Sequence, residues 1–334
     1  MSTIHMTLED AHSLAVSCLT ANGCDQANAE AAAGRMIQAE GDMCHSHGLF
    51  RLPWYASAVK SGRANGKAAP KLEQLAPAVI RVDGDGGFAP LAQAAGHAPL
   101  VACAREKGIA ALSIVNMFHI AALWPEVEAL AMEGLCAFAF TASYPYVAPA
   151  GGIKPLFGTN PMGFAWPRKD APPLVFDQAS SSMARGEIQI HARDGHDVPE
   201  TAGIGPNGEA TTDPNVVLKG AQLGFGGYKG ASLAMMIELL AGPLIGEFLS
   251  IESAADDGGK GGPPKGGELI IALDPAQFGD ANGFLEHGEK LFEAILAEEG
   301  TRLPGVRRFQ NRAQTPETGI DIPQSLHETI LALI

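Results

Sequence analysis

A short stretch near residue 50 carries side chains suited to acid–base chemistry and carboxylate binding. Ser46, His47, Gly48 and Arg51 supply a hydroxyl, an imidazole, a flexible backbone point and a fixed cation. Histidine has the side-chain pKa closest to neutrality, and the planar guanidinium of arginine matches a carboxylate bidentately. Together they suit a small 2-oxo or 2-imino acid. Considered alone, the stretch favours another interpretation, in which His47 caps a helix and Arg51 is a surface charge.

Two other segments have the composition of anion sites. Gly224–Gly230 precedes a strong helical pattern, so backbone N–H groups and Lys229 converge on a helix N-terminus, where phosphates of a dinucleotide bind well. A simple glycine cap is the equal alternative, and no Ser or Thr follows Lys229 as a P-loop requires. Arg302–Arg308 collects three guanidinium groups that suit a 2′-phosphate. Without other support, a solvated turn is the preferred interpretation there.

Leu156–Pro161 offers the short polar groups of Thr159 and Asn160 beside a proline. This segment is interpreted either as a pocket lining or as an ordinary turn, which Asn-Pro dipeptides usually mark.

Helical periodicity and capping signals position the first of these segments. Thr7 and Asp10 resemble a capping box ahead of a helix that ends at Asn22-Gly23. A second helix is predicted over 26–40 and closes at Gly41-Asp42, which places Ser46 and His47 at or just past a helix end. Further helices are predicted over 91–107, 231–241 and 281–299.

A mixed sheet is predicted from short apolar runs, at residues 78–82, 109–115, 135–141, 163–166, 174–176 and 268–273. Gly84–Ala89 matches the G-x-G-x-x-A pattern of dinucleotide folds. The strand that follows ends at Asn116 without an acidic residue to hold a ribose, so we interpret the glycines as a turn, with dinucleotide binding the minority alternative. Ser250–Gly267 is predicted to be a flexible surface loop, and the tail from Thr301 a polar, partly irregular segment.

Composition limits the function classes. The chain has 334 residues, 46% of them hydrophobic, which is enough for two lobes around a large core. A formal net charge of −14 disfavours nucleic acid as a partner. The N-terminus shows no signal pattern and the longest apolar stretch, Ala231–Ile245, is interrupted, so a cytoplasmic protein without a membrane partner is expected. The scattered cysteines indicate neither disulfides nor a metal site.

Read as a set, Ser46-His47-Gly48 with Arg51, Leu156–Pro161, Gly226–Gly230 and Arg302–Arg308 resemble the malate/L-lactate dehydrogenase-like NAD(P)-dependent oxidoreductase family over nearly the whole chain. Within it, the stretches 119–125, 184–187 and 302–305 most resemble the Δ1-piperideine-2-carboxylate/Δ1-pyrroline-2-carboxylate reductases. The resemblance implies an α/β, non-Rossmann fold in which a mixed, mostly antiparallel sheet flanked by helices binds NADPH, and it implies a homodimer. It also implies one catalytic unit, with a helical substrate and dimer lobe (1–75 with 275–334) and an NADPH-binding lobe (76–274).

The same resemblance assigns roles by position. His47 is the proton donor with Ser46 and Glu187 as relay partners, and the substrate contacts are Arg51, Thr159, Arg185 and Gly186. Cofactor contacts fall at His119, Ile120, Ala121, Ala122, Leu123, Asp177, Gln178, Ala179, Lys229, Gly230, Arg302, Leu303, Pro304, Gly305, Val306, Arg307 and Arg308. The closest relatives are expected to carry aspartate where this chain has Glu187. Ile120-Ala121-Ala122 replaces a His-Phe-Gly stretch of the hydroxy-acid enzymes and favours a different substrate.

The resulting hypothesis is an NADPH-dependent reductase of cyclic 2-imino acids, which produces L-pipecolate or L-proline by hydride transfer to C2. One alternative keeps the fold and takes a linear 2-hydroxy acid such as malate, lactate or ureidoglycolate. The other is a non-catalytic dimer that only binds an anion at Lys229 and Arg302–Arg308.

Overall fold

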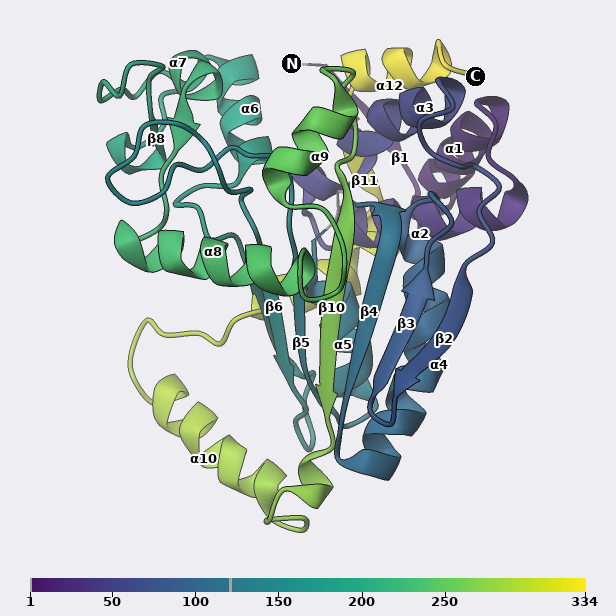
Figure 1. Cartoon of the computed structure of the whole chain (residues 1–334), viewed down its shortest axis with the longest axis vertical. Helices are drawn as coiled ribbons and strands as arrows, with labels where there is room; N and C mark the ends of the chain where they lie inside the picture. The colour runs from purple at the N-terminus through teal and green to yellow at the C-terminus, as the bar shows by residue number, and fades with distance from the viewer. Residues whose placement is uncertain (1, 120–121) are drawn as a thin grey trace.

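A mixed sheet forms the centre of the molecule (Figure 1). The computed structural model describes residues 2–119 and 122–334. Within them the strand order of the main sheet is β2-β3-β4-β10-β5-β6-β7, and every neighbouring pair is antiparallel except β3 with β4. The predicted α/β fold with a mostly antiparallel sheet is therefore confirmed. The strands are β2 (Lys71–Ala76), β3 (Val79–Asp83), β4 (Ile109–Phe118), β5 (Cys136–Thr141), β6 (Met162–Trp166), β7 (Leu174–Gln178) and β10 (Lys265–Leu273).

Helices cover both faces of the sheet and form a separate cluster beside one end of it (Figure 1). The sheet is flanked by α4 (Ala89–Lys107), α5 (Trp124–Met132), α8 (Tyr228–Ala241) and α9 (Ser250–Asp257). Helix α10 (Phe284–Leu296) stands out from the sheet, and its Phe284 contacts Trp166 at the end of β6. The cluster contains α1 (Leu8–Ala21), α2 (Gln26–Gly41), α3 (Leu52–Lys60), α11 (Val306–Thr318) and α12 (Gln324–Leu331). A smaller unit joins α6 (Arg185–Asp194), α7 (Pro214–Lys219), β8 (Gly203–Ile204) and β9 (Ala221–Gln222). No helix in the described part of the chain is both long and apolar enough to cross a bilayer.

Side-chain alternation explains how the sheet packs. On β5, Ala137 and Ala139 point into the large core shared with α4 and α5, whereas Phe138 and Phe140 point to the opposite face. Successive side chains of a strand alternate between faces. The small residues on the first side let the helices approach closely, and the aromatic residues on the second leave a broad apolar surface that α8 covers only in part.

Two predictions about the second half of the chain are wrong. The expected loop Ser250–Gly267 contains α9 and the first residues of β10. Two of its serines are buried and bonded, because Ser250 Oγ donates to Glu238 Oε2 at 2.9 Å and Ser253 Oγ donates to the Lys265 carbonyl at 2.7 Å. A low content of apolar residues therefore did not make this segment a loop throughout, because tertiary hydrogen bonds hold its helical part in place.

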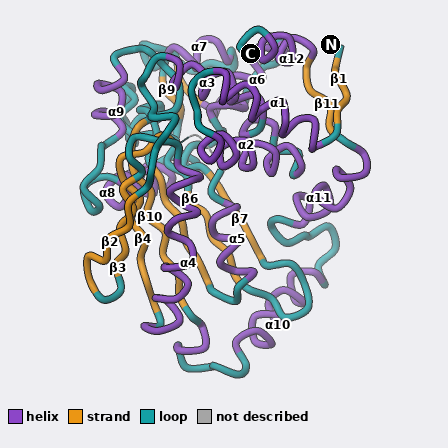
Figure 2. The backbone as a smooth tube through the Cα atoms, turned by 90° about the vertical axis from the view of Figure 1, so that its right-hand side faces the viewer, coloured by secondary structure: helices purple, strands orange, loops and turns teal. Residues whose placement is uncertain are grey.

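The tail from Thr301 is also more regular than predicted. It forms α11, β11 (Ile320–Pro323) and α12, and β11 pairs with β1 (Thr3–Met6) near the N-terminus. Figure 2 shows α11 on the side of the molecule close to α2. Its Arg312 binds Asp42 bidentately, with Nε–Oδ1 and Nη2–Oδ2 distances of 2.7 Å. The edge strand β2, all of whose residues are exposed, was not predicted.

Candidate active site

A cavity of about 570 Å³ collects residues from segments far apart in the sequence. Its walls come from the 3-10 turns η1 (His45–His47) and η2 (Leu49–Arg51), the residues after β4, the end of β7 and the N-terminus of α6. The structure brings together in this cavity all of the predicted catalytic and substrate-binding residues, which are Ser46, His47, Arg51, Thr159, Arg185, Gly186 and Glu187.

The turn that carries His47 is fixed by Glu40 at the end of α2. One carboxylate oxygen of Glu40 lies 2.6 Å from His45 Nδ1, and the other accepts the Leu49 backbone N–H at 2.7 Å. A Cβ at Gly48 would lie 2.1 Å from Glu40 Oε1, so only glycine leaves room for this carboxylate. Packing against Glu40 therefore explains the glycine of Ser46-His47-Gly48, whereas the chemistry of the site concerns Ser46 and His47.

The imidazole of His47 is partly buried and uncharged. Ser46 Oγ lies 3.0 Å from its Nδ1, and Trp124 packs edge-on with a ring-centroid distance of 6.5 Å. Burial, followed by the positive charge of Arg51 and by His119, lowers the pKa of His47 to about 3. A ring in this state carries a single N–H, and a change in nearby charge is needed to make it accept a second proton.

Arg51 is a buried cation without an acidic partner. Its residue is only 6% exposed, its Nε donates to the Ser46 carbonyl at 2.7 Å, and Trp54 lies beneath its guanidinium at 4.9 Å. No carboxylate lies within ion-pair distance of Arg51 in the described parts of the chain. Burial lowers its pKa to about 10. A desolvated guanidinium that faces a cavity is a site for an anion.

The N-terminus of α6 forms the opposite wall. A Cβ at Gly186 would lie 2.6 Å from Arg51 Nη2, so glycine is needed for α6 to approach the guanidinium. Arg185 stacks on Tyr146 at 4.3 Å and donates from Nη2 to the Leu218 carbonyl at 2.9 Å. Glu187 is exposed at the rim and makes no hydrogen bond to His47 in the described structure. Its relay role stays a prediction.

A second cavity, of about 630 Å³, lies beside the first and shares Met43, Cys44, Asp177 and Arg308 with it. The whole Arg302–Arg308 segment lines it, and Arg308 stacks on Trp124 at 4.8 Å. Arg302 and Arg307 are exposed and have no ion-pair partner among the described residues. Two connected cavities, one of them with unpaired guanidinium groups, fit an elongated dinucleotide with an extra phosphate.

The other predicted cofactor residues occupy different environments. His119, Ala122, Gln178 and Ala179 line the first cavity. Asp177 caps α5, because its carboxylate accepts the backbone N–H groups of Leu123 at 2.5 Å and Trp124 at 3.1 Å.

Three described residues of this set, Leu123, Lys229 and Gly230, line neither cavity. Leu123 is fully buried in the core, and Lys229 is exposed. Gly230 packs against the Ser180 carbonyl, where a Cβ would lie 2.4 Å from the oxygen. Ile120 and Ala121 lie outside the described residues.

Comparison with known proteins identifies the family. The family model described as "Malate/L-lactate dehydrogenase" matches residues 6–331. The chain belongs to the malate/L-lactate dehydrogenase family.

Several relatives of the chain within the malate/L-lactate dehydrogenase family are reductases. The chain is 47% identical to the Δ1-pyrroline-2-carboxylate/Δ1-piperideine-2-carboxylate reductase of Pseudomonas aeruginosa, with 99% of both chains covered. It is 46% identical to the Δ1-pyrroline-2-carboxylate reductase of Ancylobacter novellus, over 99% of this chain and 97% of the relative. The crystal structure of Δ1-piperideine-2-carboxylate reductase from Pseudomonas syringae matches with a TM-score of 0.94 and 38% identity, over 99% of this chain and all of that one. The predicted family and its oxidoreductase chemistry are confirmed.

Sequence reasoning missed several residues of this family member's site. Trp124 and Tyr146 line the first cavity, and Gln93, Glu126 and Glu268 form a buried polar cluster next to His119. One signal was available, because Glu268 places an ionisable group in the otherwise apolar run of a predicted strand.

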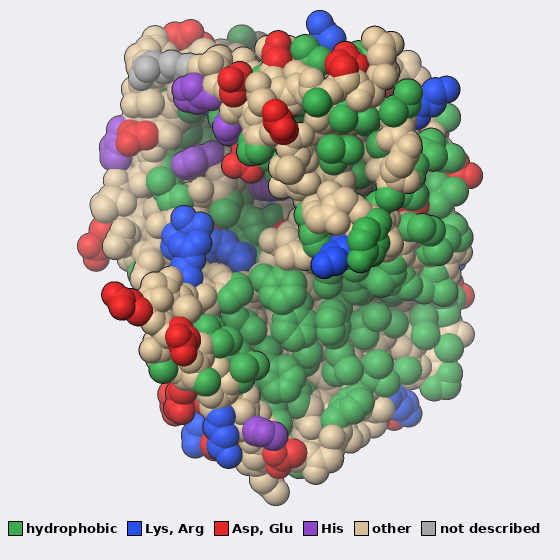
Figure 3. Space-filling view, turned by 90° about the vertical axis from the view of Figure 1, so that its left-hand side faces the viewer, with side chains coloured by type: hydrophobic (Ala, Val, Ile, Leu, Met, Phe, Trp, Pro, Cys, Tyr) green, Lys and Arg blue, Asp and Glu red, His purple; other side chains and the backbone are tan. Residues whose placement is uncertain are grey.

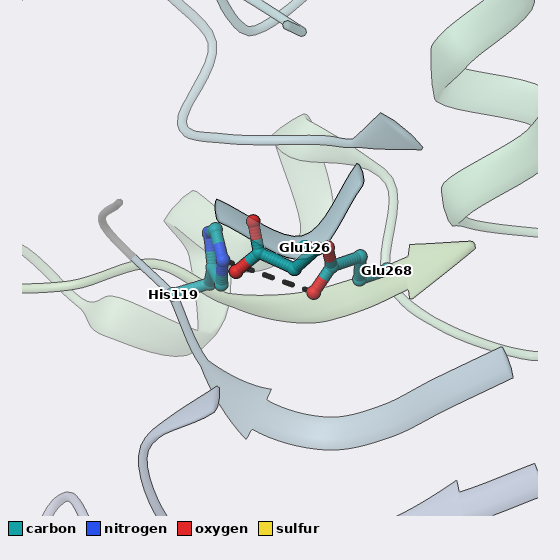
Figure 4. Close-up of side chains that lie close together, drawn as sticks. All are labelled: His119, Glu126 and Glu268. Carbon is teal, nitrogen blue, oxygen red and sulfur yellow. Dashed lines mark ion pairs between the residues drawn. The ribbon is translucent and has the colours of Figure 1, made fainter. Parts of the chain in front are cut away.

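The same cluster is a possible metal-ligand set, which the sequence did not indicate. Figure 4 shows His119, Glu126 and Glu268 pointing toward one another, and their ligand atoms all lie within 4.8 Å. The hydrogen bonds around this set are described below.

Proposed function

We propose that this protein reduces cyclic 2-imino acids, Δ1-piperideine-2-carboxylate to L-pipecolate and Δ1-pyrroline-2-carboxylate to L-proline, with NADPH. The observation that carries the proposal is the buried, unpaired guanidinium of Arg51 beside the neutral imidazole of His47. The names of the reductases of Pseudomonas aeruginosa and Ancylobacter novellus support the substrate class. The cavity has room for a small ring and its carboxylate.

Arg51 orients the substrate in this proposal. Its fork binds the carboxylate, and the stacked Trp54 and neighbouring Gly186 restrict its rotation. Orientation of this kind is worth several kcal/mol of barrier reduction. When bound, NADPH supplies the hydride that C2 accepts.

His47 controls the proton at the ring nitrogen. The positive charge of Arg51 contributes to its lowered pKa, so a carboxylate on Arg51 offsets that charge and raises the pKa of His47 once substrate is bound. Ser46 holds Nδ1 and orients the ring. Glu187, at the rim of the cavity, passes protons between solvent and the Ser46–His47 pair.

We further propose that the chain works as one catalytic unit with the lobes 1–75 plus 275–334 and 76–274. The N-terminal helices share a core with Ile320, Ile322 and Ile330, which supports the first lobe. One element of it, α10, packs on the other lobe, where Arg168 binds Glu289 bidentately at 2.9 and 2.6 Å.

The test is NADPH oxidation by the purified protein with the two cyclic imines, pyruvate and oxaloacetate, each in a separate reaction. Turnover of the imines alone supports the proposal. Turnover of the linear oxo acids alone would replace it with a hydroxy-acid dehydrogenase. NADPH binding without any turnover would favour the non-catalytic anion-binding dimer.

We propose that Arg307 helps to select NADPH over NADH. It is exposed, lines the second cavity and has no ion-pair partner among the residues described. Charged hydrogen bonds contribute about 1.5–3 kcal/mol, so Arg307→Ala should raise the KM for NADPH about 10- to 100-fold. The KM for NADH, measured in parallel, is the control. An equal rise for both cofactors would contradict a role in phosphate recognition.

We propose that a second copy of the chain covers the open apolar face. Figure 3 shows hydrophobic side chains gathered across this side of the molecule. On α8, Met235, Met236 and Leu239 are exposed, and Phe138 and Phe164 stack on the adjoining sheet face at 4.9 Å. Soluble monomers rarely expose a continuous patch of this kind.

The dimer proposal is tested by a substitution that places one negative charge on this apolar face. Leu239→Glu should convert a dimer into a monomer in sedimentation velocity, because a carboxylate is costly to bury in an apolar interface. Met132→Glu is the matched control, since Met132 is 68% exposed at the end of α5. A Leu239→Glu protein that remains dimeric would show that the contact lies elsewhere.

A further inference from the structure

A closed polar cluster lies behind His119, on the side away from the cavity. It is assembled from Arg35 on α2, Gln93 on α4, Glu126 on α5 and Glu268 on β10. The side chains of Glu126 and Glu268 are 3% and 0% exposed. In Figure 4 both carboxylates turn toward the His119 ring. No role assigned above uses these residues.

The charges in this cluster do not balance when both carboxyls are ionised. Arg35 is the cation that faces it and lies 3.2 Å from Glu126 Oε1. The other charged neighbour is Asp177, an acid that acts on Glu126. Both oxygens of Glu126 and Oε1 of Glu268 are buried and have no hydrogen-bond partner. Each carboxyl has an oxygen within 4.8 Å of the other. Two buried carboxyls this near to each other, with one cation beside them, need a proton or a second cation.

The orientation of Gln93 is fixed by its neighbours. Arg35 Nη2 donates to Gln93 Oε1 at 3.2 Å, which leaves the amide N–H groups to donate elsewhere. Gln93 Nε2 lies 2.7 Å from Glu268 Oε2 and 3.2 Å from His119 Nε2. His119 Nε2 is therefore an acceptor, and the ring proton sits on Nδ1.

We propose that Glu268 is a positioning residue that stays a neutral carboxylic acid and, through Gln93, holds His119 as the Nδ1–H tautomer at the cavity wall. The acid proton sits on Glu268 Oε1, the oxygen of this carboxyl that has no hydrogen-bond partner. Glu268 Oε2 is then the carbonyl oxygen that accepts from Gln93.

Two further observations support a proton over a metal ion in this cluster. The Gln93 amide nitrogen already bonds both His119 Nε2 and Glu268 Oε2, which are 3.8 Å apart, so the position between these two ligands is filled. Burial, followed by the charge of Glu126, raises the pKa of Glu268 to about 8, and burial also raises the pKa of Glu126. The cluster then carries one acid proton at neutral pH.

The test compares Glu268→Gln with Glu268→Ala. Glutamine reproduces the neutral acid, so Glu268→Gln should keep wild-type turnover within about threefold near pH 7. Ionisation of Glu268 adds an unbalanced negative charge beside His119 near pH 8. Wild-type turnover should therefore fall through that range, and the fall should be absent in Glu268→Gln. Glu268→Ala, which leaves the Gln93 amide without its Oε2 acceptor, should lose at least tenfold at every pH.

Two readouts do not require turnover, so they distinguish failure of this inference from failure of the proposed function on which its kinetic arm rests. When the pKa of an acid is higher in the folded state than in the unfolded state, the fold loses stability as the pH rises from the unfolded-state pKa to the folded-state pKa. The Tm of the wild type should therefore fall relative to that of Glu268→Gln between about pH 5 and pH 8. Nitrogen-15 NMR should show His119 protonated on Nδ1 in both proteins.

Three results would overturn the proposal. One is a Glu268→Gln enzyme as impaired as Glu268→Ala. Another is His119 protonated on Nε2. The third is a stoichiometric divalent metal in the purified protein that Glu268→Gln lacks.

Discussion

Replacing His47 with alanine should lower kcat about 10²–10⁴-fold, the range of a positioned general acid, and leave the Kd for NADPH within about threefold. The imidazole lines the first cavity, whereas the unpaired Arg302 and Arg307 lie in the second, so catalysis and phosphate binding are separable. Stopped-flow hydride transfer and fluorescence titration of NADPH measure the two quantities. Loss of both to the same degree would mean that His47 maintains the site's structure instead.

His45→Ala is the matched control for this experiment. His45 lies in the same turn and bonds Glu40 at 2.6 Å, so its removal perturbs the local fold and keeps the His47 imidazole. We expect a loss of less than tenfold in kcat. A loss as large as that of His47→Ala would show that the geometry of the turn, and not the His47 ring, carries the effect.

Ser46→Ala should act through the same ring with a smaller effect. Ser46 Oγ, 3.0 Å from His47 Nδ1, fixes the orientation of the imidazole without reaching further into the mechanism. Because a neutral hydrogen bond contributes about 0.5–1.5 kcal/mol, kcat should fall about 2- to 10-fold. The double variant with His47→Ala should be no slower than His47→Ala alone.

Replacing Arg51 with methionine should lower kcat/KM by about 2–5 kcal/mol of transition-state binding, which is roughly 30- to several-thousand-fold. The substrate carboxylate would then enter a buried site without a cation. Arg51→Lys keeps the charge and loses the fork, so it should fall between the wild type and Arg51→Met. Steady-state kinetics with the preferred imine measures all three proteins.

A substrate analogue provides the control for Arg51. When the substrate carboxylate is replaced by a carboxamide, kcat/KM of the wild type should fall strongly. The kcat/KM of Arg51→Met should change little, because this variant lacks the guanidinium that distinguishes a carboxylate from a carboxamide. If Arg51→Met still discriminates as well as the wild type, the carboxylate binds elsewhere, with Arg185 as the nearest alternative. Arg193 is paired with Asp194 outside the cavity, so Arg193→Met should change kcat/KM for neither the carboxylate nor the carboxamide substrate.

Stability should respond to Arg51→Met in the opposite direction to activity. Burial lowers the pKa of Arg51, and no acid among the described residues compensates the charge, so the cation opposes folding. The Tm of Arg51→Met should equal or exceed that of the wild type. A marked decrease would mean that the hydrogen bond to the Ser46 carbonyl, and not substrate binding, explains why arginine occupies this position.

Local patterns in the sequence determined most of the secondary structure. The capping residues Thr7 and Asp25 begin α1 and α2, and the apolar runs of β3–β7 and β10 follow the alternation that a sheet requires. These signals are local, because they arise from neighbouring side chains and backbone groups. The family motifs, taken in order, also predicted a site around Ser46 and His47, and both residues line the first cavity.

The tertiary structure alone decided which of the predicted groups meet. No pattern in the sequence indicates that Gly186 lies against Arg51, that Asp177 caps α5 or that Lys229 lies outside both cavities. It also missed α9 and the regular tail, whose polar side chains are satisfied by partners distant in the chain, such as Arg312 by Asp42. The periodicity of apolar residues predicts which face of a helix or strand is buried. It does not predict which side chains of other elements pack against that face. The charge balance around Glu268 therefore exists only in the folded chain, where four elements bring their side chains together.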